Sequence, residues 1–196
     1  MNLKEKIDKH CDVINLLKDE NIEIDKIISK IVKKIKKGGK ILFCGNGGSA
    51  ADAQHLAAEF IVRLRPSHSR KPLPALSLSM DSSTMSACLN DFSHNDIFLR
   101  PFLALSNKND ILFAISTSGN SQNIIKVLKN VNKKKIYTVA LLGKNGGNAK
   151  KYTDNKIVVK SDNVAIIQES HIFLGHYILE KVEDNLIKLL FLFIRF

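Results

Sequence analysis

The sequence predicts an α/β protein: a three-layer α-β-α sandwich around a five-stranded parallel sheet, preceded by an N-terminal helical hairpin. Five short apolar runs are typical of buried strands, and they span residues 40–44, 74–78, 110–115, 136–142 and 157–159. Segments with helical spacing of apolar residues alternate with these runs, at residues 49–64, 82–89, 121–131 and 165–190. Alternating strands and helices form parallel sheets that are covered on both faces. The chain of 196 residues therefore fits a single domain, 1–196, with no internal repeat or linker.

Two amphipathic segments precede the first strand. Apolar residues recur at helical spacing from Leu3 to Leu17, and the same pattern is stronger from Ile22 to Ile35. The second segment runs into Gly38 and Gly39, and glycine commonly follows the last turn of a helix. We therefore expect helices over residues 1–37 and the sandwich with its C-terminal helix over residues 40–196.

Composition and charge limit the class of protein. Apolar residues make up 44% and charged residues 25% of the chain, which is typical of a globular domain. The net charge of +11 would permit an anionic partner. Much of the lysine, however, alternates with apolar residues at 30–40 and 126–135, as it does on solvated helix faces. Because no nucleic-acid-binding motif accompanies this charge, we expect no nucleic-acid partner.

The cysteines and the apolar segments indicate a cytoplasmic protein. Cys11, Cys44 and Cys88 have no disulfide or metal-binding spacing, so we expect reduced thiols. No apolar signal segment opens the chain, and no run reaches the roughly 18 apolar residues of a membrane span. We therefore expect no membrane partner. The apolar tail 187–196 is expected to end a packed helix, with a contact to another subunit as one option.

A serine-rich loop follows the third predicted strand and opens the next helix. It has the sequence Ser-Thr-Ser-Gly-Asn-Ser, and four of its side chains carry hydroxyl groups: Ser116, Thr117, Ser118 and Ser121. Hydroxyl groups and the free N–H groups at a helix start can donate to phosphate oxygens. Gly119 allows the backbone to approach a ligand closely. An ordinary N-capping turn is the alternative, but the strand–loop–helix context favours a phosphate monoester site.

A second glycine-rich turn, residues 45–49, follows the first predicted strand. Its glycines do not have the dinucleotide-binding spacing, and no Gly-Lys-Ser/Thr sequence follows them, so neither a dinucleotide nor ATP is expected. The side chain of Asn46 could bind ligand hydroxyl groups, and the glycines could expose N–H groups. A plain tight turn is the alternative.

Two helices carry side chains that could bind a metal. His55 and Glu59 are four residues apart and therefore share a helix face. They could share a divalent metal or form an ordinary contact between neighbouring turns. Gln168 and His176 are about two turns apart on the last predicted helix and could border one cavity. His171 faces another direction and is expected to be a core residue.

These segments together resemble the phosphoheptose isomerases of the sugar isomerase (SIS) superfamily. The resemblance extends from about residue 5 to residue 185 and rests on residues 44–50, 52–55 with Glu59, 90–92, 116–121 and 167–171 with His176. It implies a flavodoxin-like SIS fold and the conversion of sedoheptulose 7-phosphate to D-glycero-D-manno-heptose 7-phosphate. This reaction starts heptose synthesis for lipopolysaccharide or other surface glycans. The resemblance also implies a homotetramer with one zinc ion per subunit.

The resemblance assigns roles to individual positions. The implied zinc ligands are His55, Glu59, Gln168 and His176. The implied substrate contacts are Asn46, Gly47, Gly48, Glu59, Asn90, Asp91, Ser116, Thr117, Ser118, Ser121 and Gln168. Arg63, one turn beyond Glu59, is a candidate for an electrostatic role. Relatives often carry arginine where this chain has Ile166, so a charge contact made there is missing.

The implied reaction moves a carbonyl from C2 to C1 of a sugar through an enediol. We expect Glu59 to act as the base between these carbons and His176 to move protons at the oxygens. Zinc would polarise the carbonyl. A carboxylate held tightly by zinc is a poorer base, so Glu59 must detach during turnover or the zinc must be partly structural.

The sequence alone leaves three other functions open. A non-catalytic SIS relative that binds a replication initiator protein is one, and the presence of Glu59 favours an enzyme over it. The second is a sugar-phosphate sensor of a transcription regulator, although no convincing DNA-binding segment precedes residue 40. The third is an isomerase of another sugar phosphate.

Overall fold

The structure, a computed structural model, describes the backbone of residues 2–193 and the side chains of residues 2–187. Its sheet has five parallel strands in the order β2-β1-β3-β4-β5. The strands are β1 (Ile41–Gly45), β2 (Ala75–Ser77), β3 (Ile111–Ser116), β4 (Tyr137–Gly143) and β5 (Asn155–Val159). All five strands lie where the sequence predicts them, and the predicted parallel sheet is confirmed.

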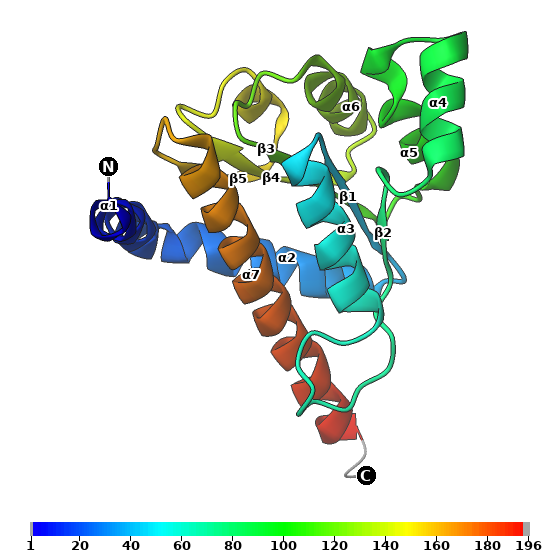
Figure 1. Cartoon of the computed structure of the whole chain (residues 1–196). Coiled ribbons are helices and arrows are strands. Elements are labelled where there is room, and N and C mark those ends of the chain that lie inside the picture. The colour runs from blue at the N-terminus through cyan, green and yellow to red at the C-terminus, as the bar shows by residue number, and fades with distance from the viewer. Residues whose placement is uncertain (1, 194–196) are drawn as a thin grey trace.

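Helices cover both faces of this sheet (Figure 1). One face packs against α2 (Asn21–Lys36), α3 (Gly48–Ile61) and α7 (Val164–Phe193). The other face packs against α4 (Ser82–Asp91), α5 (Leu99–Leu105) and α6 (Gln122–Lys133). Ile41 and Phe43 join the first core and Leu42 and Cys44 the second, because successive side chains of a strand point to opposite faces. The three-layer sandwich is therefore confirmed.

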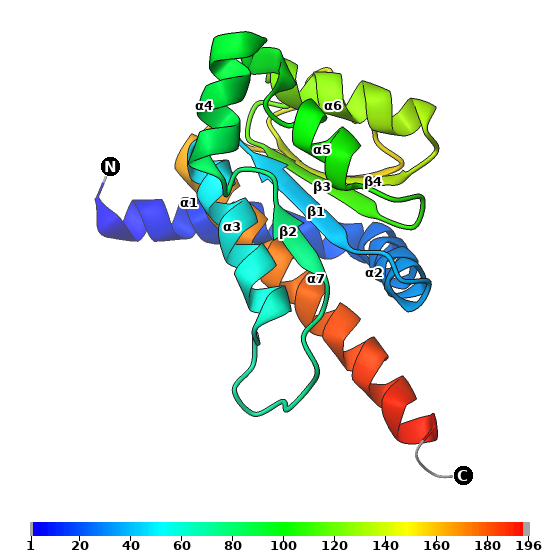
Figure 2. The same cartoon turned by 90° about the vertical axis from the view of Figure 1, so that its right-hand side faces the viewer.

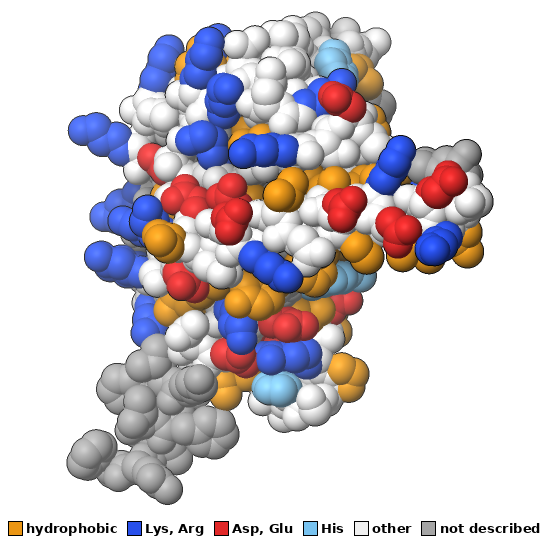
Figure 3. Space-filling view, turned by 90° about the vertical axis from the view of Figure 1, so that its left-hand side faces the viewer, with side chains coloured by type: hydrophobic (Ala, Val, Ile, Leu, Met, Phe, Trp, Pro, Cys, Tyr) orange, Lys and Arg blue, Asp and Glu red, His pale blue; other side chains and the backbone are white. Residues whose placement is uncertain are grey.

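The N-terminal helices occupy the predicted residues but do not fold back on one another. The helix α1 (Leu3–Leu16) meets α2 at a bend through the short 3₁₀ helix η1 (Leu17–Glu20), and it projects from the body (Figures 1 and 2). None of its residues is buried, whereas α2 buries five. Figure 3 shows apolar side chains along this arm, where Leu3 and Ile7 are exposed. The structure thus has a bent pair of helices in place of the expected hairpin.

Three short elements were not predicted: α5, η2 (His94–Asp96) and η3 (Ala149–Tyr152). Each is at most seven residues long, which is too short for a recognisable helical period. The helix α7 continues to Phe193, but the side chains of the apolar tail from residue 188 onward lie outside the described residues. Within the described part of the chain, no helix combines the length and apolarity needed to cross a membrane.

His171 is a fully buried side chain of α7, as expected for a core histidine. Neither ring nitrogen makes a hydrogen bond of normal geometry within the described residues. Burial disfavours the imidazolium and lowers the pKa of His171 to about 4, and the nearby Leu142 backbone opposes this only in part. The folded protein therefore holds this ring neutral across the range in which an unfolded histidine takes up a proton.

This difference predicts a loss of stability in acid. Because His171 binds its proton more weakly in the folded than in the unfolded state, its contribution is complete above about pH 6.5 and declines as pH falls toward 4. Over this range the contribution of His171 to the free energy of unfolding declines by about 1.4 kcal/mol per pH unit. We expect urea denaturation to show a smaller acid-induced loss in His171→Leu. Between pH 6.5 and 5, its free energy of unfolding should fall by roughly 2 kcal/mol less than that of the wild type. An equal fall in the free energy of unfolding of both proteins would contradict the conclusion that the fold holds His171 neutral.

Candidate active site

The two predicted ligand loops meet at the carboxyl edge of the sheet, because β1 and β3 are neighbouring strands. Asn46 donates from Nδ2 to Asn123 Oδ1 at 2.9 Å, and Asn123 donates from Nδ2 to Asn46 Oδ1 at 2.8 Å. Asn123 is fully buried in α6 and also contacts His94 Nε2, at 3.1 Å. The predicted ligand group Asn46 is thus held in a fixed orientation. Sequence reasoning missed Asn123, because one asparagine early in a helix is an ordinary residue.

The serine loop is folded so that its hydroxyl groups remain available to a ligand. Ser116 Oγ accepts from the Gly119 N–H at 3.1 Å, and Ser118 Oγ accepts from the Asn120 N–H at 3.1 Å. Accepting these bonds leaves the hydroxyl protons free to donate. Ser121 is the N-cap residue of α6, and its side chain makes no capping bond. The predicted phosphate-binding side chains of this loop therefore lie together at a helix start.

The conformation of this loop depends on Gly119. Its φ angle is +63°, and a Cβ atom there would lie 2.2 Å from the Gly146 carbonyl oxygen. The Gly119 carbonyl accepts from the Ala149 N–H at 2.8 Å, which ties the serine loop to the segment after β4. A side chain at this position would therefore be strained and would push two backbone segments apart.

We expect Gly119→Ala to weaken phosphate binding at least roughly tenfold, since a backbone shift of 1 Å can cost about 10²-fold. The measurement is inhibition by inorganic phosphate together with KM for the substrate. Gly38→Ala is the matched control. Its φ angle is also positive, at +77°, but an added Cβ there meets nothing within 4 Å. Equal effects of the two substitutions on phosphate binding would count against this description of the loop.

His55, Glu59 and His176 converge although α3 and α7 are far apart in the sequence. The two Nε2 atoms of His55 and His176 lie 2.8 Å apart across 121 residues of sequence. His55 Nε2 also lies 3.7 Å from Glu59 Oε1. Partial burial lowers the pKa of His176 and the neighbouring His55 adds to this, while Glu59 and Glu180 oppose it. At neutral pH His176 is therefore a neutral ring that can accept a proton or bind a metal.

Gln168 and Asp52 extend this cluster toward the glycine-rich loop. A Cβ atom on Gly48 would lie 2.2 Å from Gln168 Oε1, so the amide rests directly on this loop. Burial raises the pKa of the Asp52 carboxyl, whereas Gln168 and His55 beside it act in the opposite direction. Asp52 Oδ2 is buried and has no hydrogen-bond partner within the described residues. Asp52 was not among the predicted site residues, because an acidic residue near a helix start is common.

Two groups of predicted residues are exposed and bond to near neighbours in the sequence. Asn90 and Asp91 are exposed at the end of α4, where Asn90 Nδ2 donates to Asp91 Oδ1 at 2.8 Å. Arg63 is exposed, and its Nη1 donates to the Pro66 carbonyl at 3.3 Å. Asn46, Gly48, Gln168 and the serine loop are thus gathered at one edge of the sheet, whereas the hydrogen bonds of Asn90, Asp91 and Arg63 are made within their own segments.

The predicted zinc ligands fit a metal in chemical type. Imidazole nitrogen and carboxylate oxygen are normal zinc donors, and Asp52 Oδ2 is a further buried carboxylate oxygen without a hydrogen-bond partner within the described residues. Within the described residues, however, no three His, Cys, Asp or Glu side chains form a complete metal-binding group. The structure thus brings His55, Glu59 and His176 together, and the zinc ion itself stays a prediction.

This arrangement of loops and helices is shared with known proteins. The family model described as "SIS domain" matches residues 8–143. Phosphoheptose isomerase from Chlorobaculum tepidum is 48% identical over 79% of this chain and 75% of its own length. The chain belongs to the phosphoheptose isomerase family of SIS-domain proteins.

Other members of the phosphoheptose isomerase family match nearly the whole chain. The phosphoheptose isomerase from Sulfurimonas denitrificans is 40% identical over 94% of this chain and 95% of its own length. A solved phosphoheptose isomerase structure from Francisella tularensis superposes with a TM-score of 0.82 at 31% identity, covering 94% of this chain and all of the other. The family resemblance predicted from the motifs is therefore confirmed in both sequence and fold.

Proposed function

We propose that this protein interconverts sedoheptulose 7-phosphate and D-glycero-D-manno-heptose 7-phosphate. The convergence of Glu59 with His55 and His176 is the observation that carries the proposal. A ketose–aldose isomerase needs a base at the reacting carbons and an anion site for the distant phosphate. The substrate is inferred from the phosphoheptose isomerase family to which the chain belongs. No observation favours the regulator or sensor alternatives.

The chain's own residues account for each proton transfer. The serine loop binds the phosphate and so positions C1 and C2 of the open-chain sugar. Glu59 removes a proton from C1 while the neutral His176 ring donates its single N–H proton to the C2 oxygen, which produces the enediol. Glu59 then returns a proton to C2 as His176 takes one from the C1 oxygen. The aldose leaves with the carbonyl at C1, and both side chains return to their starting protonation.

We also propose one zinc ion per subunit, held by His55, Glu59, Gln168 and His176. When bound, zinc would polarise the carbonyl and stabilise negative charge on its oxygen. We propose a cytoplasmic homotetramer as well, and the exposed Leu3 and Ile7 of the projecting helix α1 support association between copies. Assembly could also bring Asn90 and Asp91 of one copy to the site of another.

The proposed function is tested by incubating the purified protein with sedoheptulose 7-phosphate and following the aldose. We expect turnover that falls when a chelator removes the metal and returns when zinc is restored. Fructose 6-phosphate serves as the comparison substrate and should turn over much more slowly. Absence of turnover with sedoheptulose 7-phosphate, in the presence of zinc, would refute the proposal.

A further inference from the structure

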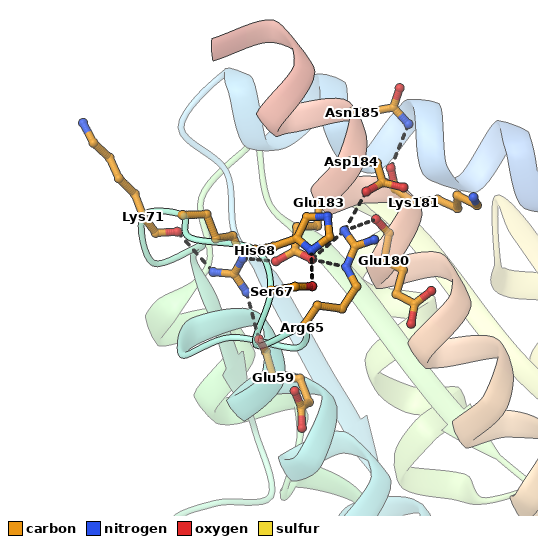
Figure 4. A network of polar contacts seen from close by, with 11 residues as sticks. Glu59, Arg65, Ser67, His68, Lys71, Glu180, Lys181, Glu183, Asp184 and Asn185 are labelled. Carbon is orange, nitrogen blue, oxygen red and sulfur yellow. Dashed lines mark hydrogen bonds and ion pairs between the residues drawn. The ribbon is translucent and has the colours of Figure 1, made fainter. Parts of the chain in front are cut away.

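An arginine-rich loop connects the end of α3 to β2 and lies beside α7 (Figures 1 and 2). This loop, residues 62–74, contains no helix or strand, yet two of its side chains hold it to α7. Arg65 and Arg70 both bind the carboxylate of Glu183. Figure 4 shows Arg65 from the loop pointing toward Glu183 and Asp184 on the helix.

Glu183 is the centre of this network and is almost completely enclosed, with 1% of its side chain exposed. Its Oε2 accepts from Arg65 Nε at 2.9 Å, and its Oε1 accepts from Arg70 Nε. Arg65 also binds Asp184 Oδ1 at 2.6 Å. Two guanidinium groups therefore pair with two carboxylates, and these ion pairs compensate the charge of the buried Glu183.

Arg70 extends the network to the helix that carries the proposed base. Its Nη2 donates to the backbone carbonyl of Glu59 at 2.9 Å, and only 3% of the Arg70 side chain is exposed. Glu59 lies in the last turn of α3, where carbonyl groups lack a partner within the helix. One guanidinium thus joins the end of α3 to Glu183 on α7.

The same two helices carry the two groups that must act together. Glu183 follows His176 by seven residues, or about two turns, so both lie on one face of α7. The clamp formed by Glu59 O, Arg70 and Glu183 therefore fixes α3 against α7 near the catalytic pair. We infer that Arg70 and Glu183 are positioning residues that set the separation of Glu59 and His176. This inference rests on the proposed function.

Arg65 supplies a matched control, because it binds the same carboxylate without binding α3. Its hydrogen-bond partners in the network are Glu183, Asp184 and the Glu180 carbonyl, all on α7. We expect Arg70→Ala to lower kcat by roughly 10–100-fold, since small displacements of reacting groups are costly. Arg65→Ala should change kcat by less than about threefold, because Glu183 still holds Arg70. Inhibition by inorganic phosphate should stay within about twofold in both variants, since the serine loop is untouched.

A second variant and a second readout keep the inference testable. If Arg70→Ala does not fold, Arg70→Lys retains a cation beside Glu183 but loses the fork that also reaches Glu59. Amide hydrogen exchange in the last turn of α3 should be faster in the Arg70 variant than in Arg65→Ala. Equal kcat in both variants, or equal exchange, would overturn the inference.

The two proposals can fail separately. Lack of wild-type turnover with sedoheptulose 7-phosphate would reject the proposed function, and the exchange comparison would then decide whether the clamp exists. Normal wild-type turnover with unchanged kcat in the Arg70 variant would reject the positioning role alone.

Discussion

Glu59→Gln is expected to lower kcat by roughly 10²–10⁴-fold, the usual contribution of a general base. The amide retains the size of the carboxylate but cannot accept a proton from C1. The half-buried position of Glu59 on α3 next to His55 should tolerate this near-isosteric change. We therefore expect thermal unfolding and inhibition by inorganic phosphate close to those of the wild type. Steady-state kinetics with sedoheptulose 7-phosphate measures the effect.

Glu180→Gln is the control for this substitution. Glu180 lies one turn beyond His176 on α7 and, like Glu59, raises the pKa of that ring, so its loss removes a similar charge from the neighbourhood. We expect its kcat to change only a few-fold, because no proton transfer is assigned to it. Comparable losses in the two variants would mean that Glu59 acts through charge alone.

Glu183→Ala is expected to destabilise the protein by about 3–5 kcal/mol, because it leaves two arginines without their shared buried partner. Arg70 is the more affected of the two, since its side chain is 3% exposed against 22% for Arg65. Water can therefore replace the lost carboxylate at Arg65 much better than at Arg70. Urea denaturation of the wild type and the variant measures the difference.

Asp184→Ala provides the matched comparison in the same network. Asp184 binds the same Arg65, but 27% of its side chain is exposed, so solvent screens the pair. Such pairs contribute about 0–1 kcal/mol. A loss for Glu183→Ala as small as that for Asp184→Ala would show that the buried network contributes little to the free energy of unfolding.

The sheet was predictable because its strands are apolar runs bounded by turns. The direction of α1 was not, since it depends on a four-residue 3₁₀ connection whose flanking residues keep helical backbone angles. No glycine or proline marks that bend in the sequence. The helix α5 was missed because seven residues give too few turns to show a period.

The site was predictable in its parts and much less so in its assembly. The spacing of His55 and Glu59 indicates a shared helix face, but their approach to His176 depends on the packing of α3 against α7. From the residues alone, an ordinary contact between neighbouring turns was a better account of that spacing than a metal site. The Arg70–Glu183 clamp gave no signal, because its loop has no periodicity and its partners are more than 100 residues apart.

Solvent deuterium exchange tests the central claim, that Glu59 transfers the proton between C1 and C2. In D₂O, the wild type with zinc should introduce deuterium at C1 of sedoheptulose 7-phosphate and at C2 of the aldose, as followed by NMR. Glu59→Gln should show almost none on the same timescale while still binding the sugar phosphate. Exchange in Glu59→Gln at the wild-type rate would contradict the account.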